Sequence, residues 1–148
     1  MLPLRRFLGL VLLPLFLLLA PAGAQASLFH LGGPPPVDLG VQAGSLAPCP
    51  SPAHCASASW SVADPSAALA SVSHLLGEQD GLAIEEQTPS YIHATATSRL
   101  FGFVDDLELY ADQAGGRLQA RSISRLGDSD LGVNGRRLGQ IGAALGHG

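Results

Sequence analysis

Apolar and polar residues alternate along the C-terminal half of the chain, and this period of two predicts antiparallel β-strands. Tyrosine, isoleucine and threonine, which favour strands, are frequent at residues 91–98. The turn residues Gln113–Gly116 separate the last two segments. We expect strands at residues 82–87, 91–98, 100–111 and 117–126, preceded by a short edge strand at 58–62.

Helical spacing of apolar residues replaces this alternation in two places. Asp64 and Pro65 are typical of a helix N-terminus, and Gly77 is a candidate C-cap. A second helix is expected from Val133 to about Leu145, following the loop 127–132. These elements predict an α+β fold: a four-to-five-stranded antiparallel sheet with two helices packed on one face, in the order β-α-β-β-β-β-α.

The N-terminus has the three parts of a secretory signal. Arg5 and Arg6 precede an apolar run at residues 7–19, and the small residues 22–24 follow. We expect cleavage after Ala24, with an uncleaved membrane anchor as the alternative. The run is shorter than a spanning helix, so no integral membrane domain is expected in the mature protein. The protein is then periplasmic or lumenal.

Composition divides the rest of the chain into two parts. Residues 25–47 contain three consecutive prolines and little periodicity, which predicts a flexible leader. Residues 48–148 form the single predicted domain.

The chain has eight basic residues, all arginine, against 12 acids. Removal of residues 1–24 takes two arginines and no acid, so the net charge falls from −4 to −6. This acidity disfavours nucleic-acid binding.

Cys49 and Cys55 are the two cysteines of the chain. In a secreted protein the economical interpretation is a disulfide that closes a short loop, with a stabilisation of about 2 kcal/mol. A metal site formed with His54 is the alternative. Three ligands without a second cluster are a weak zinc signal, so we predict no metal.

The charges on the last two strands suggest how they pair. If Asp112 lies opposite Arg117 across the turn, then Glu108 lies opposite Arg121. In this register Asp106 is diagonal to Arg121 and to Arg125. Asp105 then lies opposite Ser124 and near Ser122. Strand alternation places this acid in a row of apolar residues, and the two serine hydroxyl groups would hydrogen-bond to it there.

Together these residues predict a polar cluster, which either binds a ligand or is purely structural. Arginine forks bind carboxylates and phosphates, but internal ion-pair networks use the same residues. The cluster comprises Asp105, Asp106, Arg121, Ser122, Ser124, Arg125, Ser129, Asp130, Asn134 and Arg137.

Two other kinds of chemistry are weaker candidates. Asp128, Asp130 and Asn134 have the spacing of a calcium loop, but Gly139 stands where such a loop needs a carboxylate. The alternative is a turn in which Ser129 or Asp130 caps the last helix. A hydrolase with Asp105 or Asp106 as general base would need a nucleophile at a spacing that brings it to the base, and no motif in the sequence provides this pair.

Three segments carry a family resemblance: CPSPAHCASAS, YIHATATSRLFGFVDDLEL and RSISRLGDSDLGVNGRR. Together they resemble the domain-of-unknown-function 1499 family over roughly residues 49–141. The sequence departs from the family pattern at Gly135, where an arginine is expected, and at His54, where asparagine is usual. The resemblance implies no particular activity.

We therefore expect a secreted envelope protein without a cofactor that acts as a binding or accessory module. Its unknown partner would be an anionic small molecule, a lipid headgroup or a protein, held by Arg121, Arg125 and Arg137. A hydrolase-like enzyme and a purely structural or interaction domain are the alternatives. A non-enzymatic role is favoured over an enzymatic one.

Overall fold

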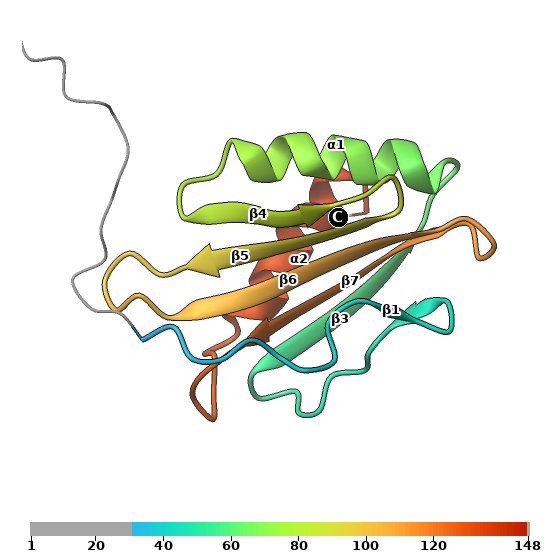
Figure 1. Ribbon diagram of the computed structural model, residues 1–148. Coiled ribbons are helices and arrows are strands. Elements are labelled where there is room, and N and C mark those ends of the chain that lie inside the picture. The colour runs from blue at the N-terminus through green and yellow to red at the C-terminus, as the bar shows by residue number, and fades with distance from the viewer. Residues whose placement is uncertain (1–30, 148) are drawn as a thin grey trace, which may run out of the picture.

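The computed structural model describes residues 31–147, so the predicted signal segment lies outside the described residues. A five-stranded antiparallel sheet forms the centre of the fold, in the spatial order β3-β7-β6-β5-β4 (Figure 1). Its strands are β3 (Cys55–Ser61), β4 (Leu82–Gln87), β5 (Tyr91–Thr97), β6 (Val104–Asp112) and β7 (Arg117–Ser124). Together with the two helices, they confirm the predicted α+β fold and its element order.

Two helices cover one face of this sheet. Helix α1 (Pro65–Gly77) begins where the Asp64 carboxylate accepts the Ala67 N–H at 3.0 Å, as its N-cap sequence predicts. Helix α2 (Val133–Ala144) packs against β3 and β7, behind the sheet in Figure 1. The core between the helices and the sheet consists of Leu69, Val72, Leu76, Ile92, Ala94, Leu107, Leu109, Ala111, Leu118, Ala120, Leu138 and Ile141.

The predicted strand at residues 100–111 is wrong at its start, because β6 begins at Val104. Residues 98–103 form a turn instead. The Ser98 N–H donates to the Phe103 carbonyl at 2.8 Å, and the Gly102 N–H donates to the Ser98 carbonyl at 3.0 Å. Gly102 has φ = +68°, a conformation that glycine adopts without steric cost. These residues therefore project beyond the end of the sheet.

Smaller differences occur at other ends. The first sheet strand begins at Cys55 rather than Ala58, and β7 ends at Ser124 rather than Leu126. Gly77 is the last residue of α1, and Glu78 is its C-cap. Propensity sets such boundaries only to within a few residues.

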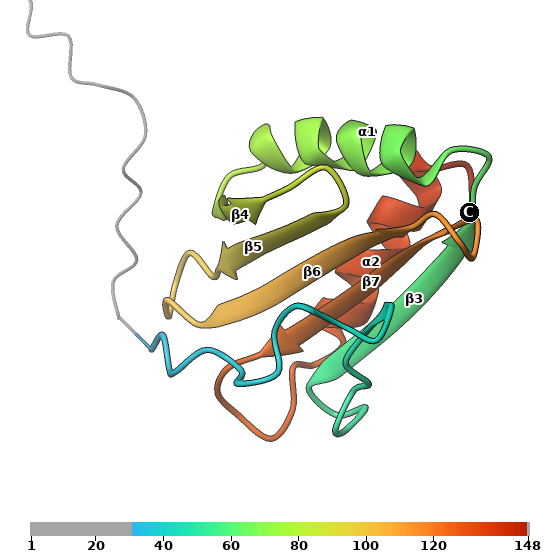
Figure 2. The same cartoon turned by 45° about the vertical axis from the view of Figure 1, so that its right-hand side comes forward.

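A short hairpin lies against the other face of the sheet. Its strands are β1 (Val41–Gln42) and β2 (Ser45–Leu46), and the two residues between them, Ala43 and Gly44, both have positive φ. Such a turn matches the twist of a tight hairpin. We call residues 38–48 the strap, because they cross β6 and β7 (Figures 1 and 2). The sequence pattern does not predict this contact of the Pro/Gly-rich segment with the sheet.

The predicted disulfide between Cys49 and Cys55 is confirmed. It joins the residue directly after the strap to the first residue of β3, and so ties the strap to the sheet edge. No helix within residues 31–147 combines the length and apolar character needed to cross a bilayer.

Two glycines of α2 test how closely the helix packs. A Cβ at Gly142 would lie 2.7 Å from Trp60 Nε1, whereas a Cβ at Gly139 would meet open space. We expect Gly139→Ala to raise the free energy of unfolding by up to about 1 kcal/mol, because alanine favours helix. Gly142→Ala should lose this gain and destabilise the fold, since α2 must move away from β3. Urea denaturation of both variants checks this; equal stabilisation would contradict the close approach.

Candidate functional site

Side-chain alternation along β6 and β7 divides the predicted polar cluster between the two faces of the sheet. The predicted register is confirmed: Asp112 pairs with Arg117, Glu108 with Arg121, and Asp105 with Ser124. Asp105 therefore faces the helices, and its neighbour Asp106 faces the strap side. The cluster is two networks, separated by the thickness of the sheet.

The network on the helix side is closed on itself. Ser124 Oγ donates to Asp105 Oδ1 at 2.6 Å, and Arg137 Nη2 donates to Asp105 Oδ2 at 2.8 Å. Arg137 Nη1 also donates to Ser122 Oγ at 2.7 Å and to Asn134 Oδ1 at 2.8 Å. Ser122 Oγ in turn donates to Asn134 Oδ1 at 2.6 Å. The buried acid thus has the hydroxyl partner that the sequence predicts, and an arginine in addition.

Asn134 connects this network to the loops. Its Nδ2 donates to Ser124 Oγ at 2.9 Å and to the His54 carbonyl at 3.2 Å. Its backbone N–H donates to Asp130 Oδ2 at 2.9 Å, while Asp130 Oδ1 accepts the Gly132 N–H at 2.8 Å. Burial raises the pKa of Asp130, but these two N–H donors outweigh it and leave the pKa below its usual value. Asp130 therefore stabilises the start of α2, whose first residues include Asn134.

Ser129 remains outside both networks. It is exposed, and its Oγ accepts the Leu131 N–H at 3.3 Å within its own loop. Within residues 31–147 no three histidine, cysteine or acidic side chains are grouped so that they could hold a metal ion.

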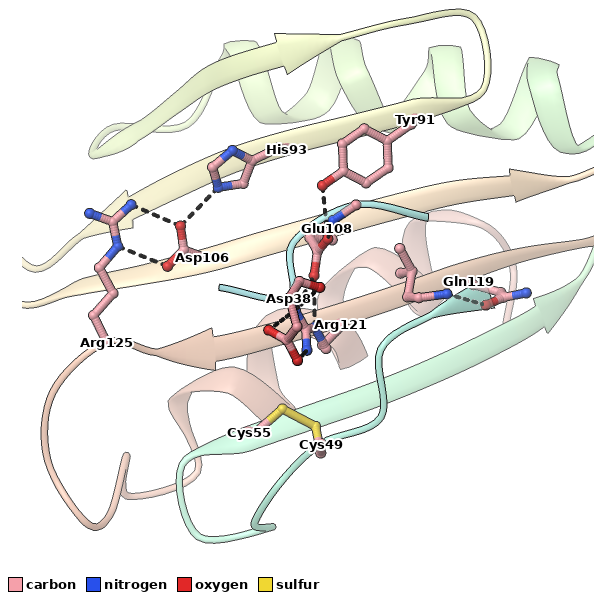
Figure 3. Close-up of polar contacts among 12 residues, drawn as sticks. Asp38, Cys49, Cys55, Tyr91, His93, Asp106, Glu108, Gln119, Arg121 and Arg125 are labelled. Carbon is pink, nitrogen blue, oxygen red and sulfur yellow. Dashed lines mark hydrogen bonds and ion pairs between the residues drawn. A yellow bond between two sulfur atoms is a disulfide. The ribbon is translucent and has the colours of Figure 1, made fainter. Parts of the chain in front are cut away.

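The network on the strap side is centred on a buried ion pair (Figure 3). Arg121 and Glu108 both have fully buried side chains, and Arg121 Nε donates to Glu108 Oε2 at 2.7 Å. Asp38, from the strap, accepts from Arg121 Nη1 at 2.9 Å and from Nη2 at 3.1 Å. The Tyr91 hydroxyl donates to Glu108 Oε1 at 2.8 Å. Every carboxylate and guanidinium here has a partner within the chain.

The pKa shifts follow from this geometry. The hydrogen bond from Arg121 holds the pKa of Asp38 below its usual value. Burial and then the Glu108 carboxylate raise the pKa of Tyr91 far above its usual value. Burial opposes the charge of Arg121, but Asp38 and Glu108 outweigh it and raise its pKa. Arg121 therefore stays charged, and its charge is neutralised internally.

The strap adds backbone contacts to these buried charges. The Gly40 N–H donates to Glu108 Oε1 at 2.6 Å, and the Leu46 N–H donates to Gln119 Oε1 at 3.2 Å. A cavity of about 360 Å³ lies beside β2 and β3, with Arg117, Gln119 and Arg121 among its lining residues. The strap is thus held by the same side chains that it covers.

Asp106 forms a second ion-pair group on this face. Arg125 donates to it through Nε and Nη2, both at 2.8 Å, and Asp106 is fully buried. His93 Nε2 lies 2.8 Å from Asp106 Oδ1. Asp106 is the first cause of the raised pKa of Arg125, so this guanidinium is also neutralised within the chain.

A larger groove, of about 580 Å³, opens at the end of the sheet on the helix side. The loop between α1 and β4, the turn between β5 and β6, the loop between β7 and α2, and α2 itself form its walls. Asp105, Ser124 and Arg137 border the groove, so the helix-side network is its polar end. The apolar lining includes Leu82, Phe101, Phe103, Leu126, Leu131 and Val133.

One arginine on the wall of the groove has no acidic partner. Among the six arginines within residues 31–147, Arg117, Arg121, Arg125 and Arg137 form ion pairs with carboxylates, whereas Arg99 and Arg136 do not. The exposed Arg136 donates one N–H to the Leu131 carbonyl at 2.9 Å. Its remaining donors are available to a ligand.

Sequence reasoning missed Asp38, Tyr91 and Arg136 as members of these sites. Asp38 lies 83 positions from Arg121 in a segment without periodicity, so no local pattern could reveal the pair. Arg136 had a usable signal, because it comes three positions after Val133 at the start of α2 and directly precedes the predicted Arg137.

Comparison with protein families gives a single clear result. The model of the family described as "Protein of unknown function (DUF1499)" matches residues 38–145. The chain belongs to the DUF1499 family. The matched region begins at Asp38, so in this DUF1499 protein it includes the strap as well as the sheet and both helices. Comparisons with curated proteins and with solved structures gave no match.

The helix-side network predicts a large effect for its acid. Asp105→Ala leaves Arg137 Nη2 and the Ser124 hydroxyl without their acceptor, and we expect it to lower the free energy of unfolding by about 1–3 kcal/mol. The exposed Asp128, whose side chain makes no hydrogen bond within residues 31–147, provides the control Asp128→Ala, expected within about 0.5 kcal/mol of wild type. Equal denaturation midpoints for the two variants would contradict the buried role of Asp105.

The strap contact predicts a pH dependence. Because the folded pKa of Asp38 is lowered, its contribution to stability is present above the ordinary value of 3.8 and is lost as the pH falls further. Asp38→Asn should lower stability by about 1–2 kcal/mol at pH 7, at the modest end because the Asp38 side chain is 43% exposed. Denaturation at pH 7 and pH 3 checks this: the difference between variant and wild type should shrink at pH 3, and a constant difference would contradict it.

Proposed function

We propose that this protein is a non-enzymatic binding module of the cell envelope, and that its groove takes an amphiphilic molecule with an anionic headgroup. The observation that carries the proposal is the groove of about 580 Å³, with apolar walls and an unpaired guanidinium, that of Arg136. Ligand sites typically have a volume of this order, an apolar lining and a few polar groups that orient the ligand.

The charges along the groove support an anionic headgroup near Arg136. Three acids, Asp80, Asp105 and Asp130, also line the groove. Asp105 is neutralised by Arg137, and both oxygens of Asp130 accept backbone N–H groups. Asp80 is exposed and comes from the loop between α1 and β4. Arg136 and Asp80 are therefore the two charges of the lining that stay uncompensated.

The ligand contacts differ from those expected from the sequence. Arg121 has no exposed side-chain surface, and Arg125 is paired with Asp106 on the opposite face of the sheet. For these two arginines the geometry favours a purely structural role in internal ion pairs over a role in ligand binding. The proposal keeps Arg137 at the polar end of the groove and adds Arg136.

The hydrolase alternative rests on the contact of Asp105 with Ser124 beside the groove. Ser124 Oγ donates to the acid and accepts from Asn134, while Arg137 holds the other Asp105 oxygen. No histidine side chain in the described part of the chain hydrogen-bonds to either residue. A nucleophile needs a base that takes its proton, and this arrangement offers Ser124 only a carboxylate that is already bound to arginine.

The envelope location is supported by two features. Arg5, Arg6 and the apolar run at residues 7–19 have the form of a secretory signal. The Cys49–Cys55 disulfide is compatible with an oxidising compartment.

Titration with decanoate tests the proposed ligand class, with decanol and acetate as comparison probes and amide chemical shifts as the measurement. We expect decanoate to shift residues 127–136 and to bind more tightly than decanol, while acetate causes no shift. Arg136→Gln should weaken decanoate binding about two- to fivefold, which is the range of an exposed charge contact. Asp80→Asn should tighten it, because it removes the uncompensated acid of the lining.

Arg117→Gln provides a matched control. It removes the same charge, but Arg117 lies at the far end of β7 and does not line the groove. It should leave the decanoate affinity unchanged. Equal loss in both variants would mean that net charge, rather than the groove, determines binding; no shift with decanoate would refute the proposed ligand class.

A further inference from the structure

The two edges of the sheet differ in how they are protected against pairing with another strand. Edge strand β4 has a bulge between Ile84 and Glu86, and its acids Glu85 and Glu86 are exposed. Bulges and charged side chains are common means by which an edge strand avoids pairing with another chain. Edge strand β3 has neither: its sequence CASASWS contains no charge and no proline, and its register with β7 is unbroken. The edge at β3 is therefore open to a further strand.

The backbone of β3 presents hydrogen-bonding groups on its outer side. The Ser124 N–H donates to the carbonyl of His54, directly before β3, at 2.9 Å, so the backbone groups of even-numbered residues face β7. Because this direction alternates along an antiparallel strand, the N–H and C=O groups of Ser57 and Ser59 point away from β7. Within residues 31–147 no strand pairs on that side, and β3 is the outermost strand there (Figure 2).

The sequence of β3 is self-complementary in the antiparallel direction. If a second copy pairs with its centre at Ala58, the middle of the strand, then Ser57 lies opposite Ser59 of the copy. Their outward N–H and C=O groups then exchange both hydrogen bonds. Ala56 lies opposite Trp60 of the copy, so a small side chain faces a large one. Because opposed residues point to the same face, serines meet on the strap side and apolar residues meet on the helix side.

Helix α2 leaves room for such a copy. It packs over β3 and β7, and its Arg137 reaches toward Asp105, at the centre of the sheet. Gly135 and Gly139 lie on the opposite side of the helix, toward the outer edge of β3. A Cβ at either glycine would meet nothing within 4 Å. These two positions therefore present no side chain that would keep a second helix away when two sheets join edge to edge.

We infer that two copies of this chain join through the outer edges of β3, paired antiparallel about Ala58, to form one continuous sheet. The inference goes beyond the binding function proposed above and does not depend on the groove or its ligand. The other edge is unsuited to this contact, because a copy at β4 would bring Glu85 and Glu86 close to the same acids of its partner. A contact of one strand and part of one helix is small, so association should be weak and depend on concentration.

Sedimentation velocity over a range of concentrations tests the dimer. The protein is purified from its own host in the form in which it occurs. Its mean mass should rise from that of one chain toward that of two between about 10 µM and about 1 mM, as mass action requires of a weak dimer.

The double variant Ser57→Lys with Ser59→Lys tests where the copies meet. It places lysines of the two copies opposite one another, and should weaken association at least about tenfold. Both serines are exposed, so the melting temperature should stay near that of the wild type. Ala83→Lys with Gln87→Lys is the matched control, since it adds the same charge at exposed positions of β4 and should leave association unchanged. The chain is acidic, so general repulsion between copies cannot explain a loss caused by added lysines.

Amide hydrogen exchange, followed by NMR over the same concentrations, tests the contact without any substitution. The N–H groups of Ala56 and Ala58 face β7 in each copy and should exchange slowly at every concentration. The N–H groups of Ser57 and Ser59 face the contact, so their exchange should slow at least about fivefold as the dimer forms. This alternation is specific to pairing at the edge of β3.

Several results would overturn the inference. One is the mass of a single chain at every concentration, and another is exchange at Ser57 and Ser59 that does not depend on concentration. Wild-type association of the Ser57→Lys and Ser59→Lys variant would mean that the copies meet elsewhere, and equal loss in the β4 control would remove the distinction between the two edges. Slow exchange of these two serines at every concentration, together with the mass of a bound peptide, would identify a foreign strand as the occupant instead.

Discussion

Asp105 and Asp106 are adjacent in the sequence and anchor opposite faces of the sheet, and most polar structure in the protein depends on this alternation. Asp105 faces the helices and holds Arg137 and Ser124. Asp106 faces the other way and holds Arg125. Since the period of a strand is two, a slip of one residue would exchange these partners and place the apolar residues of β6 on the wrong face. The register and the ion pairs therefore specify one another.

The strap completes the face that the helices leave open. Without it, the pair formed by Glu108 and Arg121 would border water; with it, both side chains are fully buried. Burial of ions is costly unless each is paired and hydrogen-bonded, and the contacts from Asp38, Gly40 and Tyr91 meet this condition. We therefore expect the paired charges to contribute less to net stability than to the unique placement of the strap. The disulfide at the end of the strap restricts it further.

The groove lies at the end of the fold where the helix-side network reaches the surface. Here the internal ion pairs leave Arg136 without a carboxylate, and the turn at residues 98–103 places apolar side chains outside the core. Uncompensated charge and exposed apolar surface are both costly to keep on a small domain, so they are the best indicators of a partner. The neutralised interior of the sheet offers no such indicator.

Sequence patterns were enough to predict the local structure: the α+β element order, the Asp64 cap of α1, the disulfide, and the pairing of β6 with β7 from the charges across one turn. Each depends on residues close together in the chain, where spacing and charge restrict the geometry. The position of the strap, the separation of the polar cluster by the sheet, and the groove depend on contacts between distant segments. Asp38 reaches Arg121 across 83 positions, and the groove is built from four distant segments. Such contacts arise from packing between elements, and no periodicity along the chain records which distant surfaces will meet.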